Sequence, residues 1–103
     1  MVHFFAAYGQ PPDAGAFDRH YFDVHVPLAK GLPGLRRYSI SRNPTTVRGP
    51  GPYHLVALLD WDAMDSLRQD FASPLGEQVA RDVDYLATLC PSIRSTIFEL
   101  EVV

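Results

Sequence analysis

The segment Leu55–Leu59 (LVALL) constrains the fold more than any other part of this chain, because five successive residues are apolar. Successive side chains of a strand point to opposite faces of its sheet, so an uninterrupted apolar strand is buried on both faces. Residues 4–7 (FFAA) and 97–98 (IF) have the same character. A fold that contains these strands therefore has to cover both sides of its sheet.

Four strands are predicted, since four apolar or alternating segments are bounded by residues that favour turns. They span residues 2–8, 35–42, 53–61 and 93–102. The segments between the first two strands and between the last two strands have helical patterns instead.

In the first helical region, Asp13 is a candidate N-cap, and apolar residues follow it at helical spacing. This stripe, which is expected to face the core, consists of Phe17, Tyr21, Val24 and Leu28.

The second helical region predicts two helices. Asp62 is placed to cap a short helix that runs to about Phe71, and Ser73-Pro74 is typical of the start of a longer helix that Pro91 ends. The order of elements is then βαββαβ, the pattern of ferredoxin-like α+β proteins, with the helices on one face of a four-stranded antiparallel sheet. Residues 1–103 are expected to form this single domain.

The helices of such a fold cover one face of the sheet, which leaves the apolar residues of the other face without cover. A chain of 103 residues has no further element for that face. We therefore expect a homodimer in which two sheets pack face to face around a shared, barrel-like core. The other interpretation is a monomer that exposes a few apolar residues, as many proteins do.

The composition excludes several kinds of partner. The net charge is −3 and the isoelectric point about 5.7, so no basic face is available to neutralise nucleic-acid phosphates. No apolar run approaches the ~20 residues that cross a bilayer, and the N-terminal residues lack a signal-peptide pattern.

The single cysteine indicates the compartment. Cys90 is the only cysteine, which excludes an internal disulfide and fits a reducing cytoplasm. The excess of arginine over lysine suggests a bacterial source.

His25 is the candidate catalytic residue because of its position next to a helix-breaking residue. Pro27 lacks an amide N–H, so the carbonyl of Asp23 loses its helical partner and the helix is expected to kink or break. A helix C-terminus favours imidazolium and burial favours imidazole, and together they can bring the pKa of His25 near neutrality. In the alternative interpretation, His25 only hydrogen-bonds a free carbonyl at the kink.

No metal or cofactor site is expected. His20 and His25 are five residues apart, which is roughly 140° around an α-helix, so the two rings are not expected to approach one ion. His20 is interpreted as a surface residue, and His3 and His54 as strand residues at an edge or an interface. Residues 62–89 hold no histidine that would bind haem.

The remaining possibility is a small-molecule site between the first helix and the sheet, with apolar and aromatic walls. The candidate pocket residues are Phe5, Tyr21, Leu28, Tyr38 and Trp61. Tyr21 or Tyr38 would hydrogen-bond a substrate oxygen. Each of these residues also has an interpretation as a core or dimer-packing residue.

Residues 17–38 and a later segment carry a family resemblance. The run from Phe17 to Ala29 and the segment LPGLRRY at 32–38 contain the pattern HxPLxxxLPGLRRY, and FASP at 71–74, Gly76 and Asp82-Val83 follow. This pattern resembles the EthD family of dimeric α/β-barrel proteins. The resemblance implies the ferredoxin-like fold, the sheet-to-sheet dimer and His25 as the usual site residue. It defines no reaction, because relatives with this barrel include cofactor-free oxygenases, cyclases, dehydratases, isomerases and haem-binding enzymes.

Two functions stay open from the sequence. The first is an enzyme in which His25 is the general acid or base on a hydrophobic, oxygen-bearing molecule, as a cofactor-free oxidoreductase, a lyase or an isomerase. The second is a dimeric ligand-binding or accessory protein without catalysis. A filled core beside His25 would instead indicate a purely structural role.

Overall fold

The computed structural model describes all residues from 1 to 103 and contains one antiparallel sheet with the strand order β2-β3-β1-β4. The strands are β1 Val2–Tyr8, β2 Leu35–Arg42, β3 Leu55–Trp61 and β4 Ile93–Glu99. The two most apolar strands, β1 and β3, are neighbours in the middle of the sheet, and β2 and β4 are its edges. This arrangement confirms the predicted ferredoxin-like α+β fold, with third and fourth strands shorter than expected.

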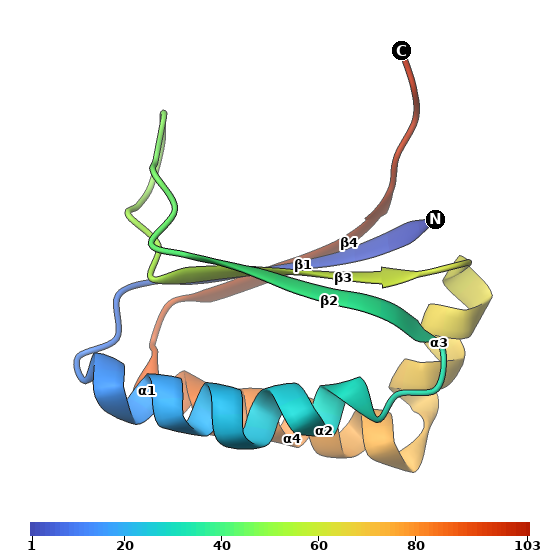
Figure 1. Cartoon of the computed structure of the whole chain (residues 1–103), viewed down its shortest axis with the longest axis horizontal. Coiled ribbons are helices and arrows are strands. Elements are labelled where there is room, and N and C mark those ends of the chain that lie inside the picture. The colour runs from blue at the N-terminus through green and yellow to red at the C-terminus, as the bar shows by residue number, and fades with distance from the viewer.

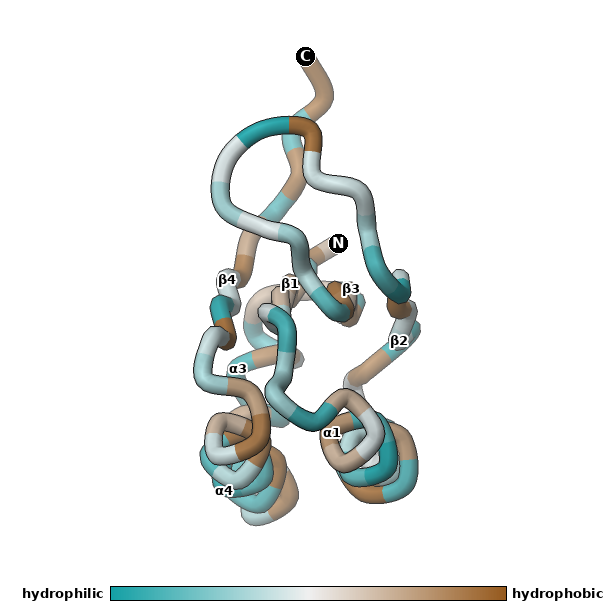
Figure 2. Tube along the Cα trace, turned by 90° about the vertical axis from the view of Figure 1, so that its left-hand side faces the viewer, coloured by the Kyte–Doolittle hydropathy of each residue, from teal (hydrophilic) through white to brown (hydrophobic).

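All helices lie beneath one face of this sheet (Figure 1). They are α1 Ala14–His20, the π-helical turn η1 Tyr21–His25, α2 Val26–Lys30, α3 Met64–Ala72 and α4 Pro74–Leu89. Figure 2 shows the first helical region and α4 side by side below the strands, and the two regions contact each other. None of the helices combines the length and the apolar character needed to traverse a bilayer.

Two of the helices begin where side-chain signals predict. At α1, the carboxylate of Asp13 accepts a hydrogen bond from the N–H of Ala16 at 3.0 Å. At α4, Oγ of Ser73 accepts from the N–H of Gly76 at 3.0 Å, and Pro74 occupies the first turn, where no N–H is needed. The N-cap predictions for both helices are therefore confirmed.

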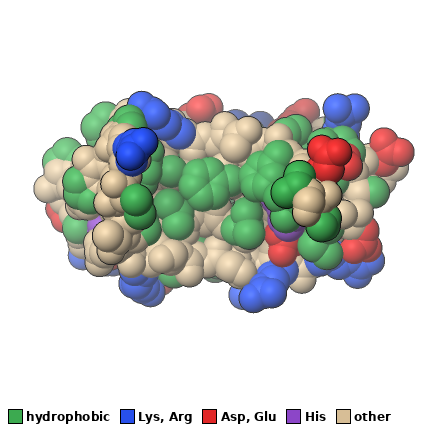
Figure 3. All heavy atoms as spheres, turned by 90° about the horizontal axis from the view of Figure 1, so that it is seen from above, with side chains coloured by type: hydrophobic (Ala, Val, Ile, Leu, Met, Phe, Trp, Pro, Cys, Tyr) green, Lys and Arg blue, Asp and Glu red, His purple; other side chains and the backbone are tan.

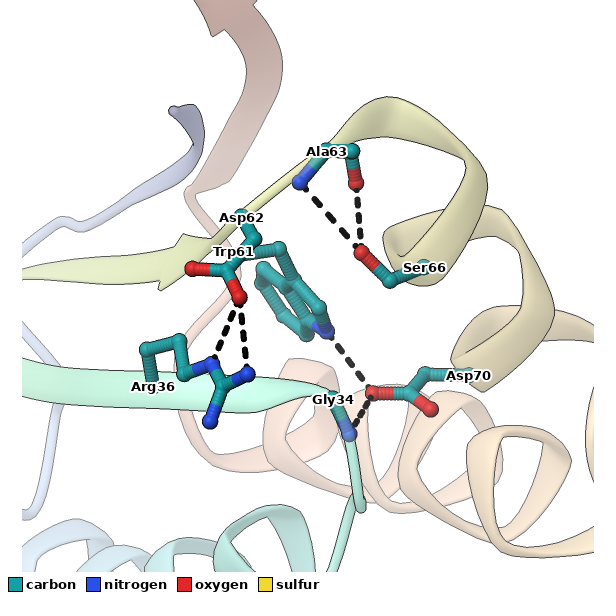
Figure 4. Close-up of polar contacts among 7 residues, drawn as sticks. All are labelled: Gly34, Arg36, Trp61, Asp62, Ala63, Ser66 and Asp70. Carbon is teal, nitrogen blue, oxygen red and sulfur yellow. Dashed lines mark hydrogen bonds and ion pairs between the residues drawn. The ribbon is translucent and has the colours of Figure 1, made fainter.

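The start of α3 differs from the prediction, as Figure 4 shows. The helix begins after Ala63, where Oγ of Ser66 accepts from the Ala63 N–H at 3.3 Å and donates to the Ala63 carbonyl at 2.8 Å. Asp62, the predicted cap, instead pairs with Arg36 of β2 at 2.7 Å. The carboxylate is therefore used for a contact between strands and not for the helix.

A buried carboxylate fixes this end of the molecule (Figure 4). Nε1 of Trp61 donates to Oδ2 of Asp70 at 2.7 Å, and the N–H of Gly34 donates to the same oxygen at 2.9 Å. Asp70 is only 4% exposed, so it requires such donors. The contact ties the end of β3 to α3 and to the turn before β2, and it places the Trp61 ring between the sheet and the helices.

The first helical region departs most from expectation, because the helix does not break at Pro27. It widens into η1, where the N–H of Val26 bonds the carbonyl of Tyr21, five residues earlier. Pro27 then falls in the first turn of α2, where its missing N–H costs no helical bond. The wide turn therefore replaces the predicted kink.

The wide turn also changes which residues face the core. The buried residues of this region are Phe17, Tyr21, His25 and Ala29, each four positions after the last. Val24, which the α-helical pattern placed in the core, is 44% exposed. The extra residue in the turn therefore rotates the buried stripe away from the predicted positions.

The other face of the sheet has no helix over it. Phe5 pairs with Leu58 and Ala7 pairs with Val56, so these four side chains share this face. Figure 3 views it and shows hydrophobic side chains gathered in its middle. The loop between β2 and β3 and the C-terminal residues rise on the same side (Figures 1 and 2). One copy of the chain therefore leaves an apolar sheet face framed by two protruding segments.

Candidate functional site

A cavity of about 70 Å³ lies between the helices and the sheet. Its wall comes from all four strands, from the first helical region and from α3 and α4. Thirteen of the 15 lining residues are hydrophobic, and the exceptions are His25 and Ser95. An apolar cavity with few polar groups is the usual form of a small-molecule site.

The cavity continues outward into a groove of about 350 Å³ between α4 and the strands β1 and β4. The residues that line both spaces are Phe4, Leu32, Phe71, Val79, Val83 and Ser95. Ala80 and Asp84, on the exposed side of α4, line only the groove. The inner cavity is smaller than the ~300–1,000 Å³ of ordinary ligand sites, so a ligand that reaches His25 also occupies the groove.

His25 is held in the cavity wall by a residue of α4. Its Nδ1 is 2.7 Å from Oδ2 of Asp82. Because an ionised carboxylate only accepts hydrogen bonds, Nδ1 is the donor and carries the proton of the neutral ring. Nε2 makes no hydrogen bond within the protein, yet no fully buried side-chain nitrogen or oxygen lacks a partner. Nε2 therefore faces accessible space, where it is available to a bound molecule.

The surroundings of His25 favour its uncharged form. Burial lowers the pKa of His25 below its ordinary value, the hydrogen bond and charge of Asp82 oppose this shift, and His20 adds a further lowering effect. At neutral pH the ring is therefore a neutral base. Asp82 also supplies the counter-ion for the imidazolium that forms when Nε2 accepts a proton.

Tyrosine hydroxyl groups lie next to this ring. The hydroxyls of Tyr21 and Tyr38 are 2.6 Å apart, and Tyr38 lines the cavity while Tyr21 lies behind it and stacks on His25. Burial raises the pKa of Tyr38 to about 12, and it raises the pKa of Tyr8 and of Tyr21 further. All three phenols stay protonated near neutral pH, so they can donate hydrogen bonds to a ligand oxygen or to each other.

His20 reaches the same carboxylate from α1. Its Nε2 is 2.7 Å from Oδ1 of Asp82, while His25 uses Oδ2. The π-helical turn explains this convergence, because its i→i+5 pattern brings residues five apart toward one face, whereas an α-helix separates them by roughly 140°. His20, interpreted from the sequence as a surface residue, therefore belongs to the site.

Three of the predicted site residues lie in the cavity wall, and a fourth lies behind it. His25, Tyr38 and Trp61 line the cavity, and Tyr21 contacts it through Tyr38. The structure thus brings together residues from the first helical region, from β2 and from β3.

The other two predicted pocket residues do not line the cavity. Phe5 lies on the opposite face of the sheet, because successive residues of β1 alternate and Phe4 occupies the cavity side. Leu28 is half-buried, and Ala29 takes the lining position because η1 rotates the stripe. The Phe5 and Leu28 assignments are corrected accordingly.

Asp82 is a second site residue, besides His20, that the sequence did not identify. It is 57 residues away from His25 in the chain, and no local spacing connects the two. Its only signal was its place in the family-like segment Asp82-Val83.

Two other histidines pair with one carboxylate each. His3 contacts Asp60 at 2.6 Å on the open face of the sheet, and His54 contacts Asp18 at 2.7 Å between the loop and α1. Across the whole chain, no group of three or more His, Cys, Asp or Glu side chains has the arrangement that a metal ion needs. Asp82 is thus distinguished by accepting from two imidazoles at once.

The fold and the site define an α+β protein of the ferredoxin-like type with a cavity between its helices and its sheet. The chain belongs to the EthD family, because the family model of the EthD domain matches residues 10–89. This range includes all three members of the cluster formed by His20, Asp82 and His25.

Solved structures show the same architecture. An EthD family protein from Bacillus halodurans superposes with a TM-score of 0.84 at 30% identity, over 98% of this chain and 99% of that chain. SnoaB, a cofactor-independent oxygenase from Streptomyces nogalater, gives 0.72 at 18% identity, over 99% and 94% of the two chains. A dimeric ferredoxin-like protein of unknown function from Thermobifida fusca gives 0.69 at 15% identity, over 96% and 90%. The last two share the fold with this chain.

Proposed function

We propose that this protein is an enzyme that acts on a hydrophobic, oxygen-bearing small molecule, with His25 as its general acid/base. The observation that carries the proposal is the position of His25, which lines a mostly apolar cavity while its Nδ1 is held by Asp82 and its Nε2 has no partner within the protein. Family membership and the similarity in fold to a cofactor-independent oxygenase support small-molecule chemistry of this kind.

The proposed step is a proton transfer. Nε2 of His25 removes a proton from a hydroxyl group or from a carbon next to a carbonyl group. Asp82 stabilises the imidazolium, and the hydroxyl of Tyr38 donates a hydrogen bond to the ligand oxygen that gains negative charge. Isomerisation, loss of water or reaction with oxygen then follows according to the bound molecule, so the step fits a lyase, an isomerase or a cofactor-free oxidoreductase.

The ligand is proposed to bind with its oxygen inward. His25 and Tyr38 line the inner cavity and not the groove, which is mostly apolar. An elongated molecule with one oxygenated end therefore fits both spaces together.

A homodimer through the open sheet faces is part of the proposal. One copy exposes the apolar strip that contains Phe5, Val56 and Leu58, and a second copy offers the complementary surface by symmetry. A neighbour in fold is described as dimeric. The same packing would cover both faces of the two central strands, as their sequences require.

The test uses 2-tetralone, an apolar ketone whose hydrogens next to the carbonyl exchange with D₂O when a base removes them. We expect the wild-type protein to accelerate this exchange, followed by ¹H NMR. We expect His25→Gln to reduce the acceleration by ~10²–10⁴-fold, the range of general-base catalysis. His54→Gln, which alters another histidine–aspartate pair, is the matched control. Binding of tetralone without acceleration would instead indicate a ligand-binding protein.

A further inference from the structure

The cluster of His20, Asp82 and His25 contains one more histidine than a single general base requires. Each carboxylate oxygen of Asp82 lies 2.7 Å from one ring: Oδ1 from His20 Nε2 and Oδ2 from His25 Nδ1. The exposed fraction of the side chains rises from 6% at His25 through 11% at Asp82 to 20% at His20. The cluster therefore extends from the cavity wall toward solvent.

The cluster has one negative charge for two rings that can each become positive. The charges that act on His25 are those of Asp82 and His20. Two phenols also lie against the rings: Tyr21 stacks on His25, and Tyr85 of α4 lies against His20 with ring centroids 4.4 Å apart.

Tyr38 of β2 and Tyr8 of β1 face the same cavity from the sheet, and both are protonated near neutral pH. These two protonated phenols therefore do not balance a second positive charge. Two imidazolium rings on Asp82 would leave a net positive charge in a largely buried place, which is costly. Asp82 is therefore matched to one imidazolium at a time.

We propose that His20, Asp82 and His25 share one added proton, so that His20 controls when His25 acts as the base. This inference rests on the proposed function of His25. When Nε2 of His25 takes a proton from the ligand, a C–H or O–H bond of the ligand breaks and an N–H bond forms. A protonated His20 then releases its Nδ1 proton to water, and the charge of the cluster stays constant.

This exchange compensates the charge gained by the buried base at a ring that reaches solvent, so that no proton has to leave through the cavity. A ligand that fills the apolar cavity excludes water from Nε2 of His25. His20 lies on the outer side of Asp82 and remains partly exposed, so it can exchange protons with water while the ligand is bound. His20 is in this role a positioning residue, since it acts through Asp82 and does not line the cavity.

The test compares the wild-type protein with His20→Gln, whose amide can still donate to Asp82 but cannot gain a proton. Long-range ¹H–¹⁵N spectra of the histidine rings are recorded from pH 4.5 to 9. In the wild type we expect the curves of His20 and His25 to depend on each other. In His20→Gln we expect a single transition of His25 with its midpoint moved upward, because the lowering effect of His20 is removed. His54→Gln should leave the His25 curve in place.

A His25 curve that superposes on the wild-type curve in His20→Gln and in His20→Asn would overturn the inference. The second variant guards against a fold defect in the first. Hydrogen exchange of 2-tetralone with D₂O distinguishes failure of the shared proton from failure of the proposed enzyme function. Coupled histidine curves without any exchange would disprove the enzyme and leave the shared proton intact. Exchange with the same pH profile in wild type and His20→Gln would disprove the shared proton and leave the enzyme intact.

Discussion

A histidine–aspartate pair lies on each side of the sheet, and the two pairs differ in their surroundings. On the helix face, His25 and Asp82 adjoin a cavity that continues into a groove. On the open face, His3 and Asp60 pair across neighbouring strands, with the ring of Phe98 at 5.4 Å from His3. Neither residue of the second pair lines the cavity or the groove.

The comparison shows that a histidine–aspartate pair alone does not define a ligand site. Each carboxylate satisfies a buried imidazole, which is enough to explain both pairs structurally. Of the two rings, the one on the helix face lines the cavity inside the molecule. We therefore expect a ligand to bind in the cavity on the helix face, and a second copy of the chain to pack against the open face.

The largest effect is expected from a charge placed on the open face. In a symmetric dimer, Leu58→Asp would place one unpaired, buried carboxylate from each copy in the interface. We therefore expect the dimer Kd to rise by ~10³-fold or more. Sedimentation equilibrium measures this change. Ala87→Asp, an equal substitution on the exposed side of α4, should leave the dimer unchanged. A wild-type protein that is monomeric at all concentrations would refute the proposed interface.

An intermediate effect is expected in the groove on the helix face. Ala80→Trp fills a position that lines the groove but not the inner cavity, so it should hinder long ligands alone. We expect the Kd of 4-heptylphenol to rise by ~10-fold or more and that of phenol to change little. Calorimetric titration checks both, with Ala87→Trp as the control on the same helix. Equal losses for the two phenols would show that the groove is not part of the ligand site.

The smallest effect is the pH dependence of stability that arises from His25. Because folding lowers the pKa of His25 from its ordinary value of about 6.5, the unfolded chain binds this proton more readily. The contribution of His25 to the free energy of unfolding is therefore fully present above pH 6.5, and it is lost as the pH falls toward the lowered pKa of the folded state. We therefore expect His25→Gln to lose less unfolding free energy than the wild type between pH 7 and pH 5.

Urea unfolding at both pH values measures this difference, at one protein concentration because dimer stability depends on it. Tyr38→Phe, which retains His25, should keep the wild-type dependence on pH. Parallel losses in the wild type and in His25→Gln would mean that His25 titrates alike in the folded and unfolded chains.

Local signals in the sequence were sufficient for most of the fold. The strands β1 and β2 have the predicted bounds, and the caps at Asp13 and Ser73 form as expected. Each depends on neighbouring residues: alternation within a strand, or a side chain that reaches an N–H two or three positions later. The family-like pattern also pointed to His25, which lines the cavity in the structure, although its catalytic role stays a proposal.

The rest of the site depended on geometry that the sequence does not carry locally. An α-helical wheel cannot represent η1, and it therefore misplaced Val24 and Leu28 and separated His20 from His25. The contact to Asp82 joins residues 57 apart and exists only after α4 packs against the first helical region. Phe5 was assigned to the pocket because nothing in β1 alone says which face the helices will cover.

The wide turn at η1 has a consequence for comparison and redesign of such chains. A π-helical turn is equivalent to one residue inserted into an α-helix, so it acts as a phase shift between the segments on either side. Removing one residue there would leave the composition of the helix almost unchanged and would turn every later side chain by about 100° relative to the earlier ones. The rings of His20 and His25 would then no longer meet at the carboxylate of Asp82. In an alignment, the presence of this single residue is thus as informative about the site as the histidines themselves.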